Sequence, residues 1–440
     1  ARARGDRVRH RLLLGDVGTG KTAVACFALA AAADSGMQAC VMAPTGVLAQ
    51  QYAVKSGPLL EAAGVSWALL TGATPHAERA ILLEHLASGG ISVLFGTHAV
   101  LGEGVAFEHL GLVVIDEQHR FGVGQRNALR SKGPGADLLV MTATPIPRTL
   151  ALSVYGDLDT SVIRHRPIAG AGVTTRVLEG PNRDIAYGAV REALAQGRQA
   201  YVICPMVSPQ EGAESLEDVP GLDVDENGRA HQAVTLHDVQ TEVEELRRVF
   251  SPMRVEMLHG KMSARAKDEV IDDFRAGRID VLVATTVVEV GVDVPNATVM
   301  LIENGERFGL ATLHQLRGRV GRGSLPGTCF VITEVRSRRG KRTPALERLE
   351  ALAKTDDGFE LAEMDLRLRH EGEILGLRQH GGVSLRFVDL DADVDVIEHA
   401  HEDADELLRY SRDLGAVATL PLRHEVVSRY GDVFKEVSGG

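Results

Sequence analysis

The chain has 440 residues, enough for two or three domains with hydrophobic cores of their own, so a peptide or a single small module is excluded. Hydrophobic residues make up 44% and charged residues 25%, as in ordinary globular proteins, which argues against wholesale disorder. The net charge of −12 argues mildly against one large nucleic-acid surface. Basic residues nevertheless cluster at 7–11, 317–322 and 336–348, and such clusters set local fields.

Several features indicate where the protein works. No run of about 18 apolar residues occurs, so we expect no membrane span. The opening segment 1–11 is rich in arginine but lacks the apolar stretch of a signal peptide. The four cysteines are far apart in the sequence, which favours buried thiols in a reducing cytoplasm over disulfides or a zinc site; they are Cys26, Cys40, Cys204 and Cys329.

Short apolar runs alternate with helical stretches in the first third of the chain. The runs are 11–14, 39–42, 92–96, 112–115 and 138–141. Runs that are apolar throughout are typical of parallel strands covered on both faces, joined by right-handed crossovers. The sequence therefore predicts an α/β domain over residues 1–163.

The same rhythm begins again after a connector that contains glycine and proline. Its apolar runs are 200–204, 254–258, 281–284, 299–302 and 329–332, which predicts a second α/β domain over 164–342. The acidic, glycine-containing segment 209–229 is expected to be a mobile surface loop. After the second predicted domain, leucines at helical spacing predict a helical appendage over 343–440.

A glycine-rich motif lies between the first predicted strand and the first predicted helix. Residues 15–22 fit the pattern G-x-x-x-x-G-K-T, in which backbone N–H groups at a helix N-terminus cradle phosphate oxygens. The lysine neutralises the outer phosphates and the threonine hydroxyl can bind Mg²⁺. The residues expected to bind a nucleotide are Gly15, Gly18, Thr19, Gly20, Lys21 and Thr22.

A hydrolase of this kind also needs a carboxylate on the magnesium side, at the end of a neighbouring strand. Asp116 and Glu117 follow the run 112–115 and meet this requirement. We expect Thr22 and Asp116 to hold the metal, and Glu117 to orient or deprotonate the attacking water.

The second α/β domain carries an arginine-rich run, 315–322, with the sequence QLRGRVGR. Three arginines on a short turn broken by glycines make a poor core segment and a good anion clamp. We expect Arg319 and Arg322 to act as arginine fingers that reach across the cleft between the domains, a role worth roughly 10³ to 10⁵ in rate. Opening and closing of that cleft would then move a bound polymer.

These segments together resemble superfamily 2 helicases, and several narrow the resemblance to the RecG family of bacterial branched-DNA helicases. They are VIDEQHRFGV at 114–123, MTATPIPRTL at 141–150 and EVGVD at 289–293. The resemblance implies two tandem RecA-like domains, ATP and Mg²⁺ as cofactors, and a monomer acting on branched or duplex DNA in recombination and repair.

The resemblance also implies roles for individual residues. Gly291 and Asp293 would contact the nucleotide, Gln118 and His119 lie beside the catalytic carboxylate, and Thr142 with Thr144 would couple nucleotide state to domain closure. Small polar loops would contact DNA phosphates, which position a strand without reading its sequence. The predicted DNA contacts are Pro44, Thr45, Gly96, Thr97, His98, His259, Gly260, Thr285 and Thr286.

Two departures from the family pattern affect these expectations. Only residues 1–10 precede the first predicted strand, so we expect the chain to be a fragment without the N-terminal wedge domain of the family. In the loop 369–381, RHEGE stands where the family usually has Arg-Gly-Pro-Gly-Glu, which changes a turn that would follow a helical hairpin at 344–367.

Two alternative functions stay open at this point. One is a transcription-repair coupling translocase, whose family usually carries glutamate where Gln118 stands. The other is a DNA-binding module whose hydrolysis is silent. A DNA-stimulated ATPase would distinguish the translocases from such a module.

Overall fold

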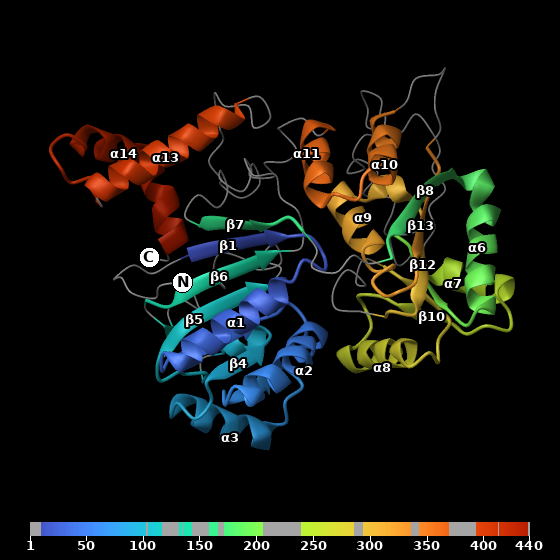
Figure 1. Cartoon of the computed structure of the whole chain (residues 1–440), viewed down its shortest axis with the longest axis horizontal. Helices are drawn as coiled ribbons and strands as arrows, with labels where there is room; N and C mark the ends of the chain where they lie inside the picture. The colour runs from blue at the N-terminus through green and yellow to red at the C-terminus, as the bar shows by residue number, and fades with distance from the viewer. Residues whose placement is uncertain are drawn as a thin grey trace. The chain divides into compact units, whose positions relative to one another are not determined.

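The computed structural model describes residues 10–102, 104–116, 132–133, 135–142, 158–165, 171–205, 239–285, 294–335, 343–368, 393–411 and 413–438. The chain divides into two compact units (Figure 1). The first comprises Ala1–Gly15, Gly20–Arg164 and Arg369–Gly440, and the second comprises Asp16–Thr19 and His165–Leu368. The domain boundaries that we expected at 163 and 342 stay predictions.

The first unit is built on a parallel sheet. Among the described residues its strands are β1 (His10–Gly15), β2 (Gln38–Met42), β3 (Trp67–Leu70), β4 (Val93–Gly96), β5 (Leu110–Asp116), β6 (Asp137–Thr142) and β7 (Asp159–Ile163). Their order is β3-β4-β2-β5-β6-β1-β7, and every neighbouring pair is parallel. The helices of this unit are α1 (Lys21–Asp34), α2 (Gly46–Ala62), α3 (His76–Ala87), α13 (Val394–Tyr410) and α14 (Leu420–Ser438), with a 3₁₀ turn, η1 (His98–Leu101).

The inner strands β1, β2, β4, β5 and β6 are buried on both faces, as their continuous apolar sequences predict. Leu13 and Val41 lie in one hydrophobic cluster with residues of α1 and α2. Their neighbours Leu12, Leu14 and Cys40 point the other way and are buried as well. Because both faces of these inner strands are covered, their polar residues lie near the strand ends.

The second unit is built on another parallel sheet, of β8 (Val173–Glu179), β9 (Gln199–Ile203), β10 (Val255–Leu258), β11 (Val281–Ala284), β12 (Ala297–Ile302) and β13 (Gly327–Thr333). Their order is β10-β11-β9-β12-β13-β8. The helices of this unit are α6 (Arg183–Ala195), α7 (Val239–Val249), α8 (Ala264–Arg275), α9 (Leu310–Arg317), α10 (Pro344–Lys354) and α11 (Gly358–Leu368). The described residues of this unit also include the 3₁₀ turns η3 (Gly180–Asn182) and η7 (Gly305–Arg307).

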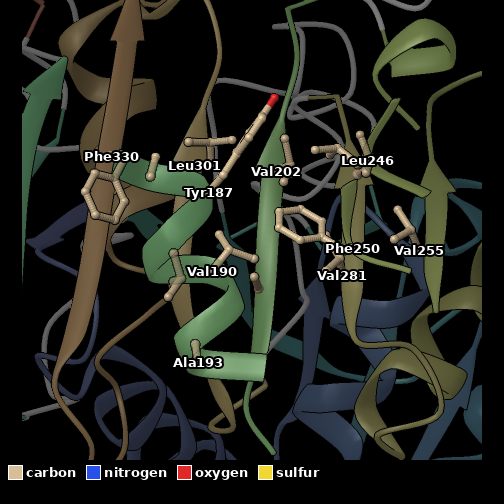
Figure 2. Packing of buried hydrophobic residues seen from close by; sticks show 14 of the residues in the cluster. Tyr187, Val190, Ala193, Val202, Leu246, Phe250, Val255, Val281, Leu301 and Phe330 are labelled. Atoms are coloured by element: carbon tan, nitrogen blue, oxygen red, sulfur yellow. The ribbon is translucent and has the colours of Figure 1, made fainter. Parts of the chain in front are cut away.

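Helices α6 and α7 pack on one face of this second sheet. Figure 2 shows Tyr187 and Val190 of α6 beside Val202 of β9, together with Phe250, the residue that follows α7 in the chain. Tyr187 and Phe250 form an edge-to-face pair with ring centroids 5.7 Å apart. Tyr201, the residue before Val202, points to the opposite face and packs against Phe274 of α8.

The two sheets repeat one strand order. Strands β1 to β6 are arranged as β8 to β13 are, and β7 is an addition at one edge of the first sheet. The pairing registers align the strands residue by residue: Ile115 pairs with Met42 and Val140, as Ile302 pairs with Ile203 and Val331. By this alignment Asp116 corresponds to Glu303, which follows the end of β12.

The fold class predicted from the sequence is confirmed, and all ten predicted strands are present. Strands β3, β7 and β8 were not predicted, and each is an edge strand of its sheet. The hairpin expected at 344–367 corresponds to α10 and α11. The segments 209–229 and 369–381 lie outside the described residues. Among the described residues, no helix is both long and apolar enough to cross a membrane.

Candidate functional site

Three of the predicted functional positions meet at the carboxyl edge of the first sheet. In the parallel register, Leu14 of β1 pairs with Thr142 of β6, and Met141 pairs with Asp116 of β5. Gly15, Thr142 and Asp116 therefore end three adjacent strands at one level. Ligand sites of open α/β sheets lie at this edge.

The glycine-rich loop that leaves β1 requires glycine at two positions. Gly18 has φ +81° and Gly20 has φ +93°, in the left-handed region that side-chain-bearing residues rarely adopt. Between them, the Thr19 amide donates to the Asp16 carbonyl and closes a tight turn. The loop thus reaches the first residue of α1 with backbone geometry that a chain without glycines would not adopt.

The N-terminus of α1 carries no side-chain cap. Its N-cap residue is Gly20, whereas α2 and α8 are capped by Thr45 and Ser263. Uncapped N–H groups at a helix N-terminus, together with the helix dipole, favour an anion. Lys21 begins α1, and its Nζ donates to the Gly15 carbonyl at 2.6 Å. A phosphate is the ligand that these groups suit.

The carboxylate at the end of β5 has a partner that sequence reasoning missed. Tyr52 Oη, on α2, donates a hydrogen bond of 2.9 Å to Asp116 Oδ2. Both residues are buried. Tyr52 is 64 positions away from Asp116, and no sequence pattern links the two residues. The position of Tyr52 in α2 predicts only that its side chain packs in the core.

At the carboxyl edge of the second sheet, the corresponding positions are occupied by an ion pair between Arg183 and Glu303. Arg183, the first residue of α6, donates from Nε and Nη2 to the two carboxylate oxygens of Glu303 at 3.0 and 2.9 Å. Burial would lower the pKa of Arg183, but the hydrogen bonds and charge of Glu303 outweigh it and raise that pKa. Arg183 begins the helix that follows β8, as Lys21 begins the helix that follows β1, and Glu303 is aligned with Asp116. In the second sheet, the carboxylate at this position is therefore paired with an arginine of the same unit.

The three arginines of the run 315–322 differ in what they contact. Arg317 is buried, and its Nη1 donates to the carbonyls of Leu352 and Thr355 at 2.7 and 2.8 Å. The expectation that this run is a poor core segment is therefore wrong for Arg317, which ties α9 to the end of α10. Arg319 and Arg322 are half-buried, and Arg322 Nε donates to the Gly318 carbonyl at 2.6 Å.

The predicted DNA contacts of the first unit follow two adjacent strands, β2 and β4. Thr45 Oγ1 accepts from the Leu48 amide and caps α2, and Thr97 Oγ1 accepts from the Ala99 amide and caps η1. A Cβ on Gly96 would lie 2.4 Å from Val100 Cγ1, so packing already requires this glycine. Pro44 and His98 lie in the same two loops, at the carboxyl edge of the sheet.

The predicted contacts of the second unit are arranged in the same way, after β10 and β11. Leu258 pairs with Ala284 at the ends of these strands, so His259 and Thr285 begin two adjacent loops. Both side chains are buried, and His259 Nδ1 has no hydrogen-bond partner within the part of the chain that the structure describes. Gly260 follows His259, and its carbonyl accepts from Lys267 Nζ at 2.7 Å.

Several predicted positions lie outside the described residues. They are Glu117, Gln118, His119, Thr144, Thr286, Gly291 and Asp293. Among the described residues, no group of three or more histidine, cysteine, aspartate or glutamate side chains could hold a metal ion. The metal roles expected of Thr22 and Asp116 stay predictions.

The chain matches two protein-family models of helicases and is similar in sequence to known helicases. Residues 5–152 match the model "DEAD/DEAH box helicase", and residues 214–324 match "Helicase conserved C-terminal domain". The ATP-dependent DNA helicase RecG of Staphylococcus aureus (strain Mu50 / ATCC 700699) is 44% identical over 400 residues, which are 91% of this chain and 54% of that protein. RecG of Bacillus subtilis (strain 168) is also 44% identical, over 399 residues, which are 91% of this chain and 55% of that protein. The chain spans about half the length of these relatives.

Solved structures of helicases are also similar to this chain. The structure of RecG bound to a three-way DNA junction superposes with a TM-score of 0.69 and 38% identity, covering 90% of this chain and 48% of that one. Dbp5 of S. cerevisiae bound to RNA and ADP BeF3 has a TM-score of 0.56 at 18% identity, covering 90% of this chain and 89% of that one. The second likeness concerns the fold alone.

Proposed function

The chain belongs to the RecG helicases over the half of their length that it spans, and we propose that it is an ATP-driven DNA translocase core that acts on duplex and branched DNA. The observation that carries the proposal is the carboxyl edge of the first sheet. There a glycine loop with two left-handed glycines, an uncapped helix beginning with Lys21, and the buried Asp116 end adjacent strands.

In this proposal the first unit binds ATP. The N–H groups at the start of α1 bind phosphate oxygens, and Lys21 exchanges the Gly15 carbonyl for the outer phosphates. Mg²⁺, when bound, neutralises phosphate charge. The buried carboxylate of Asp116 and the hydroxyl of Thr22 are of the hard oxygen type that this ion prefers. These two residues would hold it.

Hydrolysis needs further groups that we assign by family resemblance. Glu117 would orient the attacking water, with Gln118 and His119 beside it. Arg319 and Arg322 would stabilise charge on the transferred phosphoryl group. Gly291 and Asp293 would contact the nucleotide. Arg317 is not assigned to this group, because its guanidinium already binds two main-chain carbonyls.

We propose that DNA binds the loops that follow β2 and β4 in one unit and β10 and β11 in the other. These loops carry small polar residues such as Thr45 and Thr97, whose backbone and hydroxyl groups suit phosphate contacts without sequence readout. RecG has been solved on a three-way DNA junction, which supports branched DNA as the substrate. We further propose a cytoplasmic location, because free thiols, three of them buried, suit a reducing compartment. The proposal that the chain is a monomer rests on the family resemblance alone.

The test is Mg²⁺-dependent ATP hydrolysis by the chain without DNA, with linear duplex and with a model fork. We expect duplex or fork to stimulate turnover, and DNA affinity to fall steeply as salt rises, because phosphate contacts release counterions. An ATP turnover rate that is the same with and without DNA, or a DNA affinity that does not change with salt concentration, would contradict the proposal.

A further inference from the structure

We propose that Tyr52 is a positioning residue for the metal-side carboxylate of the ATP site. This inference rests on the function proposed above. Its basis is the hydrogen bond of 2.9 Å from Tyr52 Oη to Asp116 Oδ2, made between two residues that are 6% and 9% exposed. Tyr52 lies outside the sequence motifs of the predicted site.

The fold explains why this tyrosine reaches the site. Helix α2 begins directly after β2, and β2 pairs with β5, the strand that ends in Asp116. Side chains of a helix lean toward its N-terminus, which for α2 is the carboxyl edge of the sheet. Tyr52 therefore packs its ring in the cluster between α1, α2 and the strands, and extends its hydroxyl toward the strand ends.

A hydrogen bond at this place has a consequence for metal binding. A carboxylate that holds Mg²⁺ directly or through water must keep one orientation, and partners of the ligands fix it. An ionised carboxylate has about four acceptor positions, and the bond from Tyr52 occupies one of them, so this bond and metal binding are compatible. The phenol also supplies a donor in a place from which bulk water is excluded.

The competing explanation is that the phenol only satisfies its own hydrogen-bonding requirement. The second unit offers a matched case, since Tyr187 Oη donates to Glu242 Oε1 at 3.2 Å and both residues are buried. Neither of these residues belongs to a predicted nucleotide position. A structural role would make Tyr52→Phe and Tyr187→Phe equivalent, with an effect on stability and none on metal affinity.

The experiment measures Mn²⁺ binding to the ADP complex by electron paramagnetic resonance, for the wild-type chain, Tyr52→Phe and Tyr187→Phe. We expect Tyr52→Phe to weaken Mn²⁺ binding about 10-fold, within the range for lost partners of metal ligands. ADP affinity without metal should be unchanged, and excess Mg²⁺ should restore most of the ATPase turnover. Tyr187→Phe should leave all three quantities at wild-type values.

A double-mutant cycle with Asp116→Asn separates positioning from general loosening. In the Asp116→Asn background, Tyr52→Phe should change Mn²⁺ affinity by less than about 2-fold, because the group that it positions is altered. Wild-type Mn²⁺ affinity in Tyr52→Phe, or equal losses in Tyr52→Phe and Tyr187→Phe, would overturn the inference while the wild-type ATPase upholds the proposed function. Absence of both Mn²⁺·ADP binding and ATPase in the wild type would overturn both.

Discussion

Gln38 and Gln199 make equivalent hydrogen bonds in the two sheets. Gln38 begins β2, and its amide donates to the carbonyls of Leu86 and Ile91 at 2.9 and 2.8 Å. Gln199 begins β9, and its amide donates to the carbonyls of Phe274 and Ile279 at 2.7 and 2.6 Å. In each case the acceptors flank the turn that leads from a helix into the next strand. The strand order of the two sheets therefore repeats down to single side-chain contacts.

Replacing either glutamine by leucine should destabilise its own unit by about 1–3 kcal/mol, because two buried carbonyls lose their donor. Thermal unfolding of Gln38→Leu and Gln199→Leu measures this. The matched control is Gln196→Leu, at an exposed position, which should stay within about 0.5 kcal/mol of wild type. Equal unfolding of all three variants would show that the repeated contacts contribute nothing measurable.

Lys21→Ala should abolish ATP hydrolysis while the chain stays folded, because the outer phosphates lose their cationic partner. Steady-state ATPase and circular dichroism measure the two effects. Lys55→Ala, on the exposed side of α2, is the control for loss of a lysine and should hydrolyse ATP as the wild type does. Full turnover in Lys21→Ala would contradict the assignment of the phosphate site.

The arginines of the run 315–322 should separate into two classes. Arg317→Ala should destabilise the second unit by about 2 kcal/mol or more, because the carbonyls of Leu352 and Thr355 lose a charged donor. Arg322→Ala should leave stability nearly unchanged, retain ATP binding and slow hydrolysis. Thermal unfolding, nucleotide binding and turnover together distinguish them. Equal losses of ATP binding and turnover in Arg322→Ala would mean that it is not an arginine finger.

Burial raises the pKa of Glu306, which is fully buried at η7. A raised pKa in the folded state means that the native chain holds this proton after the unfolded chain has lost it. The contribution of Glu306 to folding stability is therefore fully present at a pH below 4.5, the ordinary pKa of glutamate. This contribution is lost as the pH rises through the higher pKa of the folded state.

Glu306→Gln should therefore be more stable than wild type at pH 8, with an advantage that shrinks as the pH falls toward 5. Each unit of pKa shift corresponds to about 1.4 kcal/mol. Unfolding midpoints between pH 5 and 8 measure the difference, with the exposed Glu269→Gln as the control for lost charge. An advantage that does not vary with pH would refute the explanation.

The sequence predicted the buried strands and missed strands at the edges. The strand β12 is buried at every position and reads as one apolar run. By contrast β7 and β8 are mostly half-buried or exposed and carry mixed sequences, DTSVI and VTTRVLE, because an edge strand packs less of its surface. Strand β3 has four residues, with three of them half-buried. A run of apolar residues is a signal of burial, and these strands lack it.

For the candidate site, motif spacing predicted the local parts and could not predict the distant contacts. The left-handed glycines and the start of α1 follow from the residues between Gly15 and Thr22, since a short segment determines them. The bond between Tyr52 and Asp116 joins two elements that only the folded sheet brings together. The burial of Arg317 likewise depends on α10, which sequence spacing does not place beside α9.

In the proposed function, ATP hydrolysis by this chain drives movement along duplex DNA. Displacement of a third strand from a triplex on linear duplex measures such movement directly, because a translocating protein strips the third strand without unwinding the duplex. We expect the wild-type chain to displace the third strand only with ATP and Mg²⁺, and Lys21→Ala to displace none. No displacement under conditions where duplex DNA stimulates ATP hydrolysis would contradict it.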